Sequence, residues 1–359
     1  MDPSTQGLQP DPGGTARHAR IDLGAGTAPL QRAERFGDAV GAEVWLQRED
    51  VGALGGGGNK LRKLEFLLGA ALERGCDTVV TFGALQSNHA RQTAAACARL
   101  GLRCELVLTR AVPRAGEAFE QSGNVLLDQL FGAGLTIVDH DDAELELAVA
   151  GLRTRLRDEG RVVAWIPPGG SDATGTLGWV RGGAELAGRL GDVGIDRATI
   201  VVAVSTGGTV AGLSLGLARS GRRDRVLGVC VYRSRERTAE VVDQLMRDTA
   251  ERLAPGRHRG DAPAAVAPPP DLTDEFLGAG YGLPTPEMRA AVELLARTEG
   301  IAADPVYSGK ALAAVVERCR LGRLGHRDGR DEPVVVVLTG GGPGLFAYPD
   351  VFGAEPSGD

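Results

Sequence analysis

Short runs of β-branched and aliphatic residues alternate with amphipathic segments along most of this chain, and this alternation limits the folds it can adopt. Apolar residues spaced three and four apart predict helices, and short continuous apolar runs predict buried strands. The predicted strands span residues 78–82, 105–109, 135–138, 162–166, 199–204, 226–231 and 334–338. Helices are predicted over residues 61–74, 88–100, 125–131, 145–157, 176–189, 210–219, 238–253, 286–299 and 308–321. This order predicts an α/β protein with parallel twisted sheets covered by helices.

The size and composition indicate a globular chain of two domains. The 359 residues are 43% hydrophobic and 24% charged, and the formal net charge is −7. An acidic chain does not attract nucleic acid through its bulk charge, and no apolar run approaches the roughly 20 residues that cross a bilayer. We therefore expect no nucleic-acid partner and no membrane partner.

The remaining compositional signals favour a cytoplasmic protein. Residues 1–18 lack the basic and then apolar pattern of a signal peptide, and they are predicted to form a flexible tail. The five cysteines show no CxxC spacing, which fits reduced thiols, and the five scattered histidines predict no metal site. The Pro-, Gly- and Ala-rich residues 255–270 are expected to form the most mobile loop.

Lysine is nearly absent, which makes the few that remain informative. The chain has 37 arginines and only three lysines, Lys60, Lys63 and Lys310. Arginine stays protonated in proteins, whereas a lysine amine can be desolvated and used as a nucleophile. Two of the three lysines directly follow the glycine run at residues 55–58, so we expect the chemistry there.

Two predicted helices begin with residues suited to binding anions. Ser87, Asn88 and His89 follow one predicted strand, where free N–H groups would suit a carboxylate; a plain N-cap is the alternative. Thr206, Gly207, Gly208 and Thr209 follow another strand and resemble a phosphate cradle. This second segment lacks the lysine of a nucleotide-hydrolysing loop and the GxGxxG order of a dinucleotide site. An amine, a phosphate cradle and a carboxylate site together suggest pyridoxal 5'-phosphate, held by a lysine as a Schiff base.

Several motifs resemble the pyridoxal-phosphate enzymes grouped as 1-aminocyclopropane-1-carboxylate (ACC) deaminases and D-cysteine desulfhydrases. They are GGNKLRKLEF (57–66), QSNHARQTAA (86–95), TGGTVAGL (206–213), GYGLPTPEM (280–288), DPVYSGKA (304–311) and TGGGPGLFAY (339–348). The resemblance implies fold type II, which is the tryptophan synthase β type. It also implies a large cofactor domain, residues 19–61 and 169–359, a smaller inserted domain, residues 62–168, and a homodimer.

The resemblance also implies roles for individual residues. Lys60 would form the Schiff base and move protons, and Lys63 would reach the phosphate, with a surface charge as its alternative reading. Thr206, Gly207, Gly208 and Thr209 would hold the phosphate, and Asn88 would donate to the cofactor's ring oxygen. The remaining expectations concern the substrate, whose carboxylate would be held by Ser87 and His89 and which would be flanked by Tyr281 and Tyr307. Lys310 is expected to be structural.

Two positions divide this family. In the cyclopropane deaminases a Glu follows the tyrosine of DPVY, and a Leu precedes the last glycine motif. Here these residues are Ser308 and Thr339, which resemble the desulfhydrases. A carboxylate keeps the cofactor's ring nitrogen protonated and the ring strongly electron-accepting, whereas a hydroxyl does not. The sequence thus favours β-elimination of a thiol from D-cysteine, giving pyruvate, ammonia and hydrogen sulfide.

Three alternatives stay open at this stage. One is the cyclopropane deaminase, and another is a lyase or β-replacement enzyme for a related amino acid such as cysteate or 3-chloroalanine. The third is a cofactor-binding protein without turnover. Three features depart from the family pattern, and they are expected to reshape the mouth of the substrate site: an extra glycine in Leu54 to Gly58, Trp179, and the loop at residues 255–270.

Overall fold

A computed structural model describes residues 13–52, 54–254, 267–327 and 329–353. Most of the predicted N-terminal tail, residues 1–12, and most of the predicted mobile loop, residues 255–266, lie outside these ranges. Residues 13–18 lie against two helices of the larger half: the carbonyl of Gly13 accepts from Arg219 Nε at 3.0 Å, and Arg17 donates to the carbonyl of Arg252 at 2.9 Å.

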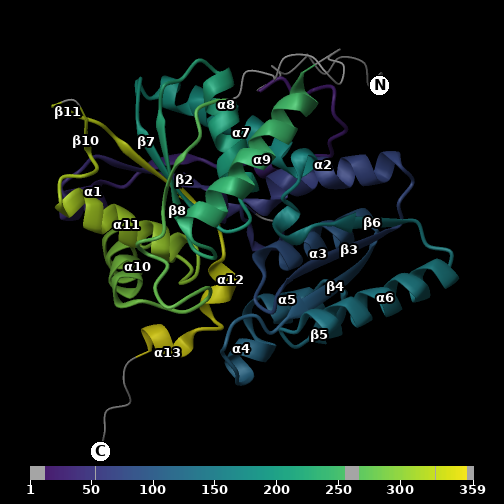
Figure 1. The fold of residues 1–359 in the computed structure, drawn as a ribbon. Coiled ribbons are helices and arrows are strands. Elements are labelled where there is room, and N and C mark those ends of the chain that lie inside the picture. Colours follow the sequence, from purple (N-terminus) through teal and green to yellow (C-terminus); the bar gives the residue numbers. More distant parts are fainter. Residues whose placement is uncertain (1–12, 53, 255–266, 328, 354–359) are drawn as a thin grey trace, which may run out of the picture.

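Two separate sheets form the centre of the molecule (Figure 1). The larger has six strands in the order β1-β2-β12-β7-β8-β9. Their bounds are β1 Leu30–Arg32, β2 Val44–Arg48, β12 Val334–Leu338, β7 Thr199–Val204, β8 Arg225–Cys230 and β9 Asp271–Thr273. All neighbours are parallel except β1, which pairs antiparallel with β2. This sheet draws strands from both ends of the chain.

The smaller sheet comes from one continuous stretch. Its four parallel strands run in the order β5-β4-β3-β6. Their bounds are β5 Gly134–Val138, β4 Arg103–Thr109, β3 Thr78–Ala84 and β6 Val163–Ile166. This arrangement is compatible with an inserted domain, while the boundaries at residues 61/62 and 168/169 stay a prediction. A two-stranded hairpin, β10 His326–Arg327 with β11 Arg330–Asp331, lies apart from both sheets.

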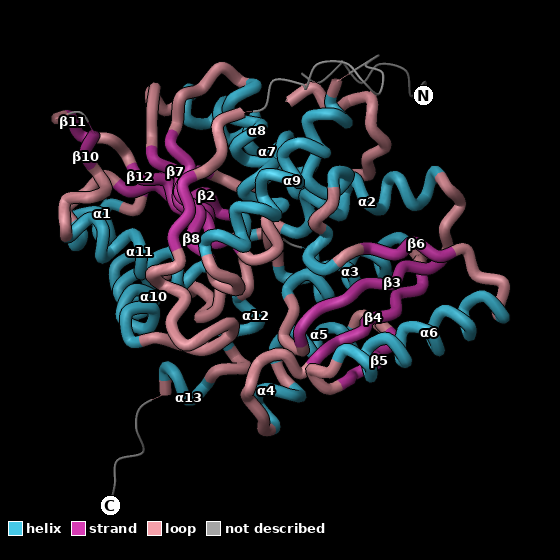
Figure 2. Tube along the Cα trace, in the orientation of Figure 1, coloured by secondary structure: helices cyan, strands magenta, loops and turns pink. Residues whose placement is uncertain are grey.

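Helices cover both faces of each sheet (Figure 2). Their bounds are α1 Glu34–Val40, α2 Lys60–Glu73, α3 Asn88–Leu100, α4 Glu117–Gln121, α5 Gly123–Leu130, α6 Asp142–Asp158, α7 Ala173–Asp192, α8 Gly208–Arg219, α9 Arg235–Leu253, α10 Pro286–Glu299, α11 Ser308–Arg320, α12 Gly342–Leu345 and α13 Pro349–Phe352. No helix in the described part of the chain is long and apolar enough to cross a bilayer.

The core shows why the central strands are apolar along their whole length. All six residues of β7 are buried. Val201 and Ala203 belong to the cluster under α10 and α11, whereas Ile200 and Val202 belong to the cluster under α7, α8 and α9. Successive side chains of a strand point to opposite faces, so a strand covered on both faces needs apolar residues at every position.

The predicted alternation of strands and helices is confirmed, with small changes at the ends. The strand at 199–204 and the helices at 88–100 and 286–299 have their predicted bounds. The helix predicted at 145–157 begins three residues earlier, because the side chain of Asp141 caps α6 by accepting from the N–H of Glu144. The short β1, β2 and β9 were not predicted; β1 and β9 have only three residues each.

Candidate active site

A cavity of about 330 Å³ opens where the carboxyl ends of strands from both sheets meet. The larger sheet contributes the ends of β7, β8 and β12, and the smaller sheet contributes the ends of β3 and β4 and the turns after β5 and β6. This edge is where parallel α/β sheets place their ligands. Most of the predicted site residues line it: Lys60, Ser87, Asn88, His89, Thr206, Gly207, Thr209, Tyr281, Tyr307 and Thr339. Lys63, Gly208 and Ser308 are not among the lining residues.

Lys60 is the first residue of α2, and its amine is held at the cavity wall. Lys60 Nζ donates to Asn59 Oδ1 at 2.9 Å, and Asn59 Nδ2 donates to Thr209 Oγ1 at 2.9 Å. Burial lowers the pKa of Lys60 to about 8, which the nearby carboxylate of Asp304 partly opposes and Arg91 reinforces. At neutral pH the amine therefore loses its proton far more readily than an ordinary lysine, as a nucleophile must.

The glycine run packs on α3. The expectation that it shapes the cavity mouth is wrong, because none of its residues lines the cavity. The carbonyl of Gly57 accepts from Arg91 at 2.7 Å and from Gln92 Nε2 at 2.6 Å. Gly58 has φ +130°, and a Cβ there would lie 1.9 Å from Gln92 Nε2, so only glycine lets the chain pass this close to α3. The run thereby delivers Lys60 to the start of α2.

Trp179 also lies away from the mouth, contrary to the expectation. Its side chain is 1% exposed in the core beneath α7, and its indole N–H donates to the carbonyl of Asn59 at 3.0 Å. Trp179 therefore supports the backbone that precedes Lys60 and does not contact the cavity.

The turn from β7 into α8 has the shape that the predicted phosphate cradle needs. Gly207 has φ +85°, which turns the chain so that the N-terminus of α8 faces the cavity. A Cβ at Gly208 would lie 2.8 Å from Lys63 Nζ and 2.9 Å from Ser171 Oγ. Lys63 and Ser171 thus lie directly against the glycines of the cradle.

Lys63 is buried, so its alternative reading as a surface charge is wrong. Its side chain is 1% exposed, and Nζ donates to the carbonyl of Gly169 at 3.1 Å and to Ser171 Oγ at 2.8 Å. Burial first and the neighbouring Lys60 second lower the pKa of Lys63 well below its usual value, while Asp172 opposes this. Both contacts are to neutral oxygens, so a bound phosphate would supply the negative charge that this amine lacks.

The N-terminus of α3 combines the two readings proposed for it. Ser87 is the N-cap, because its Oγ accepts from the N–H of Ala90 at 3.2 Å. The N–H groups of Asn88 and His89 begin the helix and have no earlier turn to bond. Ser87 retains its own O–H as a donor, so the cap leaves a binding site for a carboxylate.

The ring of His89 has the wrong hydrogen-bonding state to hold a carboxylate. Thr81 Oγ1 donates its only hydrogen to the carbonyl of Ile166 at 3.0 Å, so it can only accept from His89 Nε2, 2.9 Å away. Nδ1 is then an acceptor, and it has no partner among the described residues. Burial, reinforced by Lys60 and Lys63, lowers the pKa of His89 well below its usual value, so the ring is neutral. His89 can serve an anion through its backbone N–H only.

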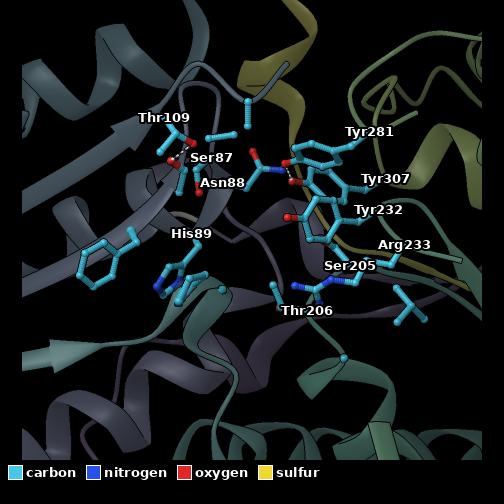
Figure 3. A pocket seen from close by; sticks show the side chains of 18 of the residues that line it. Ser87, Asn88, His89, Thr109, Ser205, Thr206, Tyr232, Arg233, Tyr281 and Tyr307 are labelled. Atoms are coloured by element: carbon cyan, nitrogen blue, oxygen red, sulfur yellow. Dashed lines mark hydrogen bonds between the residues drawn. The ribbon is translucent and has the colours of Figure 1, made fainter. Parts of the chain in front are cut away.

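Three tyrosines stand together on the side of the cavity opposite His89 (Figure 3). The hydroxyls of Tyr281 and Tyr307 are hydrogen-bonded at 2.5 Å, and the ring of Tyr232 packs edge-on against Tyr281 with centroids 5.1 Å apart. Burial raises the pKa of Tyr281 to about 12 and that of Tyr307 well above its usual value. Both phenols stay protonated at neutral pH; because one of them donates its only hydrogen to the other, the pair has one O–H left to donate to a ligand.

Ser308 and Thr339, the two positions at which the family divides, lie next to each other. Their hydroxyl oxygens lie 3.3 Å apart, and both residues are buried. Asp304 holds this region in place by accepting from the backbone N–H groups of Val306, Tyr307 and Ser308 at 2.9, 2.6 and 3.0 Å. Lys310 is structural, as expected: Nζ donates to the carbonyls of Leu277 and Gly280, next to Tyr281.

Four residues that line or support the cavity are not among the predicted site residues: Asn59, Asp304, Tyr232 and Arg233. Asn59 and Asp304 lay inside quoted motifs, and an Asp shortly before a predicted helix is a recognisable capping signal. Tyr232 and Arg233 line the cavity just beyond β8, and the arginine's guanidinium lies 4.6 Å from the centre of the tyrosine ring. Their position directly after a predicted strand is the sequence signal that could have identified them as site residues.

These residues fit pyridoxal phosphate. A reactive amine opens onto the cavity, a buried lysine with only neutral partners lies against a glycine turn, and paired hydroxyls lie elsewhere on the wall, Thr339 facing the cavity and Ser308 behind it. Lys60 would hold the aldehyde carbon, and Thr206 to Thr209 with Lys63 would hold the phosphate. Among the described residues, no group of three or more His, Cys, Asp or Glu side chains is placed to hold a metal ion.

Comparison with known proteins gives the same assignment. The family model described as pyridoxal-phosphate dependent enzyme matches residues 21–340. The chain is 39% identical over 335 residues to a D-cysteine desulfhydrase of Serratia proteamaculans, covering 93% of this chain and 97% of that protein. It is also 39% identical over 337 residues to a D-cysteine desulfhydrase of Yersinia enterocolitica, with the same coverage.

A solved structure shows that the likeness extends to the fold. The crystal structure of an ACC deaminase homologue superposes with a TM-score of 0.83 at 36% identity, covering 96% of this chain and 99% of that one. The fold is therefore the two-sheet fold type II of this family, as predicted. With Lys60, the phosphate turn and the motif matches in place, the chain belongs to the pyridoxal-phosphate-dependent enzymes, in the group of ACC deaminases and D-cysteine desulfhydrases.

Proposed function

We propose that this enzyme eliminates the thiol of D-cysteine and, with one water molecule consumed in hydrolysis, yields pyruvate, ammonia and hydrogen sulfide. The observation that carries the proposal is the pair of hydroxyls of Ser308 and Thr339, 3.3 Å apart, at the positions that divide the family. Similarity to two D-cysteine desulfhydrases along nearly the whole chain supports the same choice.

Pyridoxal phosphate, when bound, supplies an electron-accepting ring that stabilises negative charge on the substrate's α-carbon. A hydroxyl beside the ring nitrogen leaves that nitrogen less protonated than a carboxylate does, so the ring accepts electrons less strongly. Elimination tolerates the weaker ring because the sulfur on the β-carbon leaves with the bonding electrons. Opening an unactivated cyclopropane depends more heavily on the ring.

Three groups of residues divide the remaining work. The N–H groups at the start of α3 and the hydroxyl of Ser87 bind the substrate carboxylate. Lys60, whose pKa is about 8, removes the proton from the α-carbon once its amine is free. The hydrogen-bonded pair of Tyr281 and Tyr307, both protonated at neutral pH, has one O–H to donate on the other side of the cavity, where the departing sulfur gains negative charge.

A second candidate is elimination of a different group from the β-carbon. Arg233 lines the cavity beside Tyr232, so a cation is available to an anionic substituent such as the sulfonate of cysteate. The cyclopropane deaminase reaction has the likeness to the ACC deaminase homologue in its favour, and it has Ser308 and Thr339 against it.

The test is to supply D-cysteine, L-cysteine, cysteate and the cyclopropane amino acid separately to the purified holoenzyme and to quantify every product. Sulfide and pyruvate in equal amounts from D-cysteine, with little from the others, support the proposal. Sulfite from cysteate as the dominant product would replace it with the second candidate, and 2-oxobutanoate and ammonia from the cyclopropane would restore the deaminase.

A further inference from the structure

The amide of Asn88 must face the cofactor with its nitrogen. In the proposed site Asn88 donates a hydrogen bond to the ring oxygen, which carries negative charge, and the present inference rests on that role. A side-chain amide turned by 180° would present its oxygen and repel the same group. Something must therefore fix the orientation of this amide.

Asn124, on α5, fixes it through a single nitrogen atom. Asn124 Nδ2 lies 2.9 Å from the carbonyl oxygen of Gln86 and 2.9 Å from Asn88 Oδ1. A backbone carbonyl can only accept, so the Asn124 atom facing it must be the nitrogen. The same nitrogen faces Asn88, so the near atom of the Asn88 amide must be its oxygen. Figure 3 shows the Asn88 nitrogen turned the other way, toward Tyr281 and Tyr307.

Asn124 is itself held in place by the turn before α3. Its backbone N–H donates to Gln86 Oε1 at 2.9 Å, and Gln86 Nε2 donates to the carbonyls of Phe119 and Ser122 at 2.6 and 3.0 Å. Asn124 is 1% exposed, so solvent does not compete for these bonds. Backbone carbonyls therefore fix the amides of Gln86 and Asn124, and Asn124 in turn fixes the orientation of the Asn88 amide.

The amide oxygen of Asn124 indicates that the side chain is oriented to use its N–H groups as hydrogen-bond donors. That oxygen is buried and has no hydrogen-bond partner among the described residues. An unsatisfied buried acceptor is unfavourable and uncommon in folded proteins. Here both hydrogens of the amide are used while the oxygen is left without a bond.

Asparagine is as scarce in this chain as lysine. Only Asn59, Asn88 and Asn124 occur among the 359 residues. Asn59 bonds Lys60 and Thr209, Asn88 lines the cavity, and Asn124 bonds Asn88. Two of the three asparagines, Asn59 and Asn88, therefore line the cavity, and the third bonds one of them.

We infer that Asn124 is a positioning residue that holds the Asn88 amide with its N–H toward the cofactor's ring oxygen. It acts through Asn88 and does not touch the cofactor. Replacing it with a residue of similar shape that cannot donate therefore changes cofactor binding only when Asn88 is present.

The test is a double-mutant cycle on the full chain with Asn124→Asp and Asn88→Ala. It is read by the dissociation constant of pyridoxal phosphate and by the pH midpoint of the bound cofactor's visible absorbance. Asn124→Asp should weaken cofactor binding by about tenfold, the effect of losing a hydrogen bond to a charged group. It should also move the midpoint in the same direction as Asn88→Ala does. In the Asn88→Ala background it should change neither quantity further.

Two further variants separate positioning from loss of structure. Asn124→Leu removes the donor without adding a charge and should reproduce the effect. Val125→Ala creates a space in the neighbouring core of the same helix and should lower stability while leaving cofactor binding unchanged. Equal effects of Asn124→Asp with and without Asn88, or none at all while Asn88→Ala is impaired, would overturn the inference. An Asn88→Ala protein with normal cofactor binding would overturn the role of Asn88 and that of Asn124 with it, whatever the substrate proves to be.

Discussion

The two sheets turn the same edge toward the cavity but bring different groups to it. The larger sheet and its helices present most of the residues proposed to bind the cofactor: the turn after β7, the hydroxyl of Thr339 after β12, and Lys60 at the start of α2. The smaller sheet presents the start of α3, with Ser87, Asn88 and His89, after β3. In the proposed site the larger sheet would hold the cofactor's phosphate and aldehyde carbon, and the smaller sheet would hold the substrate's carboxylate and, through Asn88, the cofactor's ring oxygen.

The sheets also differ in how firmly they are built. Both faces of the larger sheet are covered by extensive apolar clusters, whereas the outer face of the smaller sheet rests on four buried residues, Val80, Val107, Leu152 and Leu156. Few buried contacts make a region easier to deform or open locally. We therefore expect the side proposed to hold the phosphate to be more rigid than the side proposed to hold the substrate's carboxylate.

The strongest test of the cofactor side is Lys60→Ala. Without the amine, the covalent link to the cofactor and the proton transfer are both lost, and turnover should fall by about 10³-fold or more. The visible absorbance band of the bound cofactor should disappear as well. Lys60→Arg is the matched control, since it keeps the charge but cannot act as the nucleophile. A Lys60→Ala protein with normal activity would remove the assignment.

A second test exchanges the hydroxyl pair for the residues of the other branch of the family. Ser308→Glu combined with Thr339→Leu should weaken thiol elimination by about tenfold, because a carboxylate near the ring nitrogen changes its protonation. Product rates with D-cysteine and with the cyclopropane amino acid give the measurement. Ser308→Thr keeps the hydroxyl and serves as the control. Elimination unaffected by the double change would refute the electron-acceptor argument.

The pH dependence of cofactor capture tests the state of Lys60. Only the unprotonated amine attacks an aldehyde, so below its pKa of about 8 the capture rate of the cofactor-free protein should fall about tenfold per pH unit. Above pH 8 the rate should level off. Trapping with borohydride at each pH gives the rate, with a small lysine peptide as the comparison. A rate that keeps rising to pH 10 would show an ordinary lysine.

A substitution in the small apolar cluster on the outer face of the smaller sheet should lower stability without changing the affinity for the cofactor. Leu156→Ala on α6 empties part of the four-residue cluster, and it should lower the free energy of unfolding by about 3 kcal/mol. Cofactor affinity should stay the same, because only the first turn of α6, at Asp142 and Leu145, lines the cavity, and Leu156 lies near the opposite end of this helix (Figure 1). Urea unfolding of the cofactor-free protein and a cofactor titration measure the two quantities. If Leu156→Ala weakened cofactor binding as well as stability, the cofactor site would depend on the outer core of the smaller sheet, contrary to this account.

The layout of the site was predictable from sequence because its residues follow strand ends. Strand ends were visible as the limits of apolar runs, and parallel strands place them along one edge. The motifs then identified Lys60, the turn at 206–209 and the start of α3. The same periodicity predicted α3 and β7 to the residue.

Properties set by distant contacts were not predictable. The hydrogen on His89 depends on Thr81 and on the carbonyl of Ile166, 85 residues from Thr81. The burial of Lys63 depends on Gly169 and Ser171, more than 100 residues away. No local pattern records which residues a fold brings against a given side chain.

The division between a cofactor side and a substrate side is tested most directly by the dissociation constant of pyridoxal phosphate in two variants. Lys63→Met removes the buried amine beside the phosphate turn, and it should weaken binding by about tenfold or more. Ser87→Asp keeps the N-cap acceptor of α3 but places a negative charge where the substrate carboxylate binds. It should change cofactor affinity by no more than about twofold. Equal losses in the two variants would contradict the division of labour between the sheets.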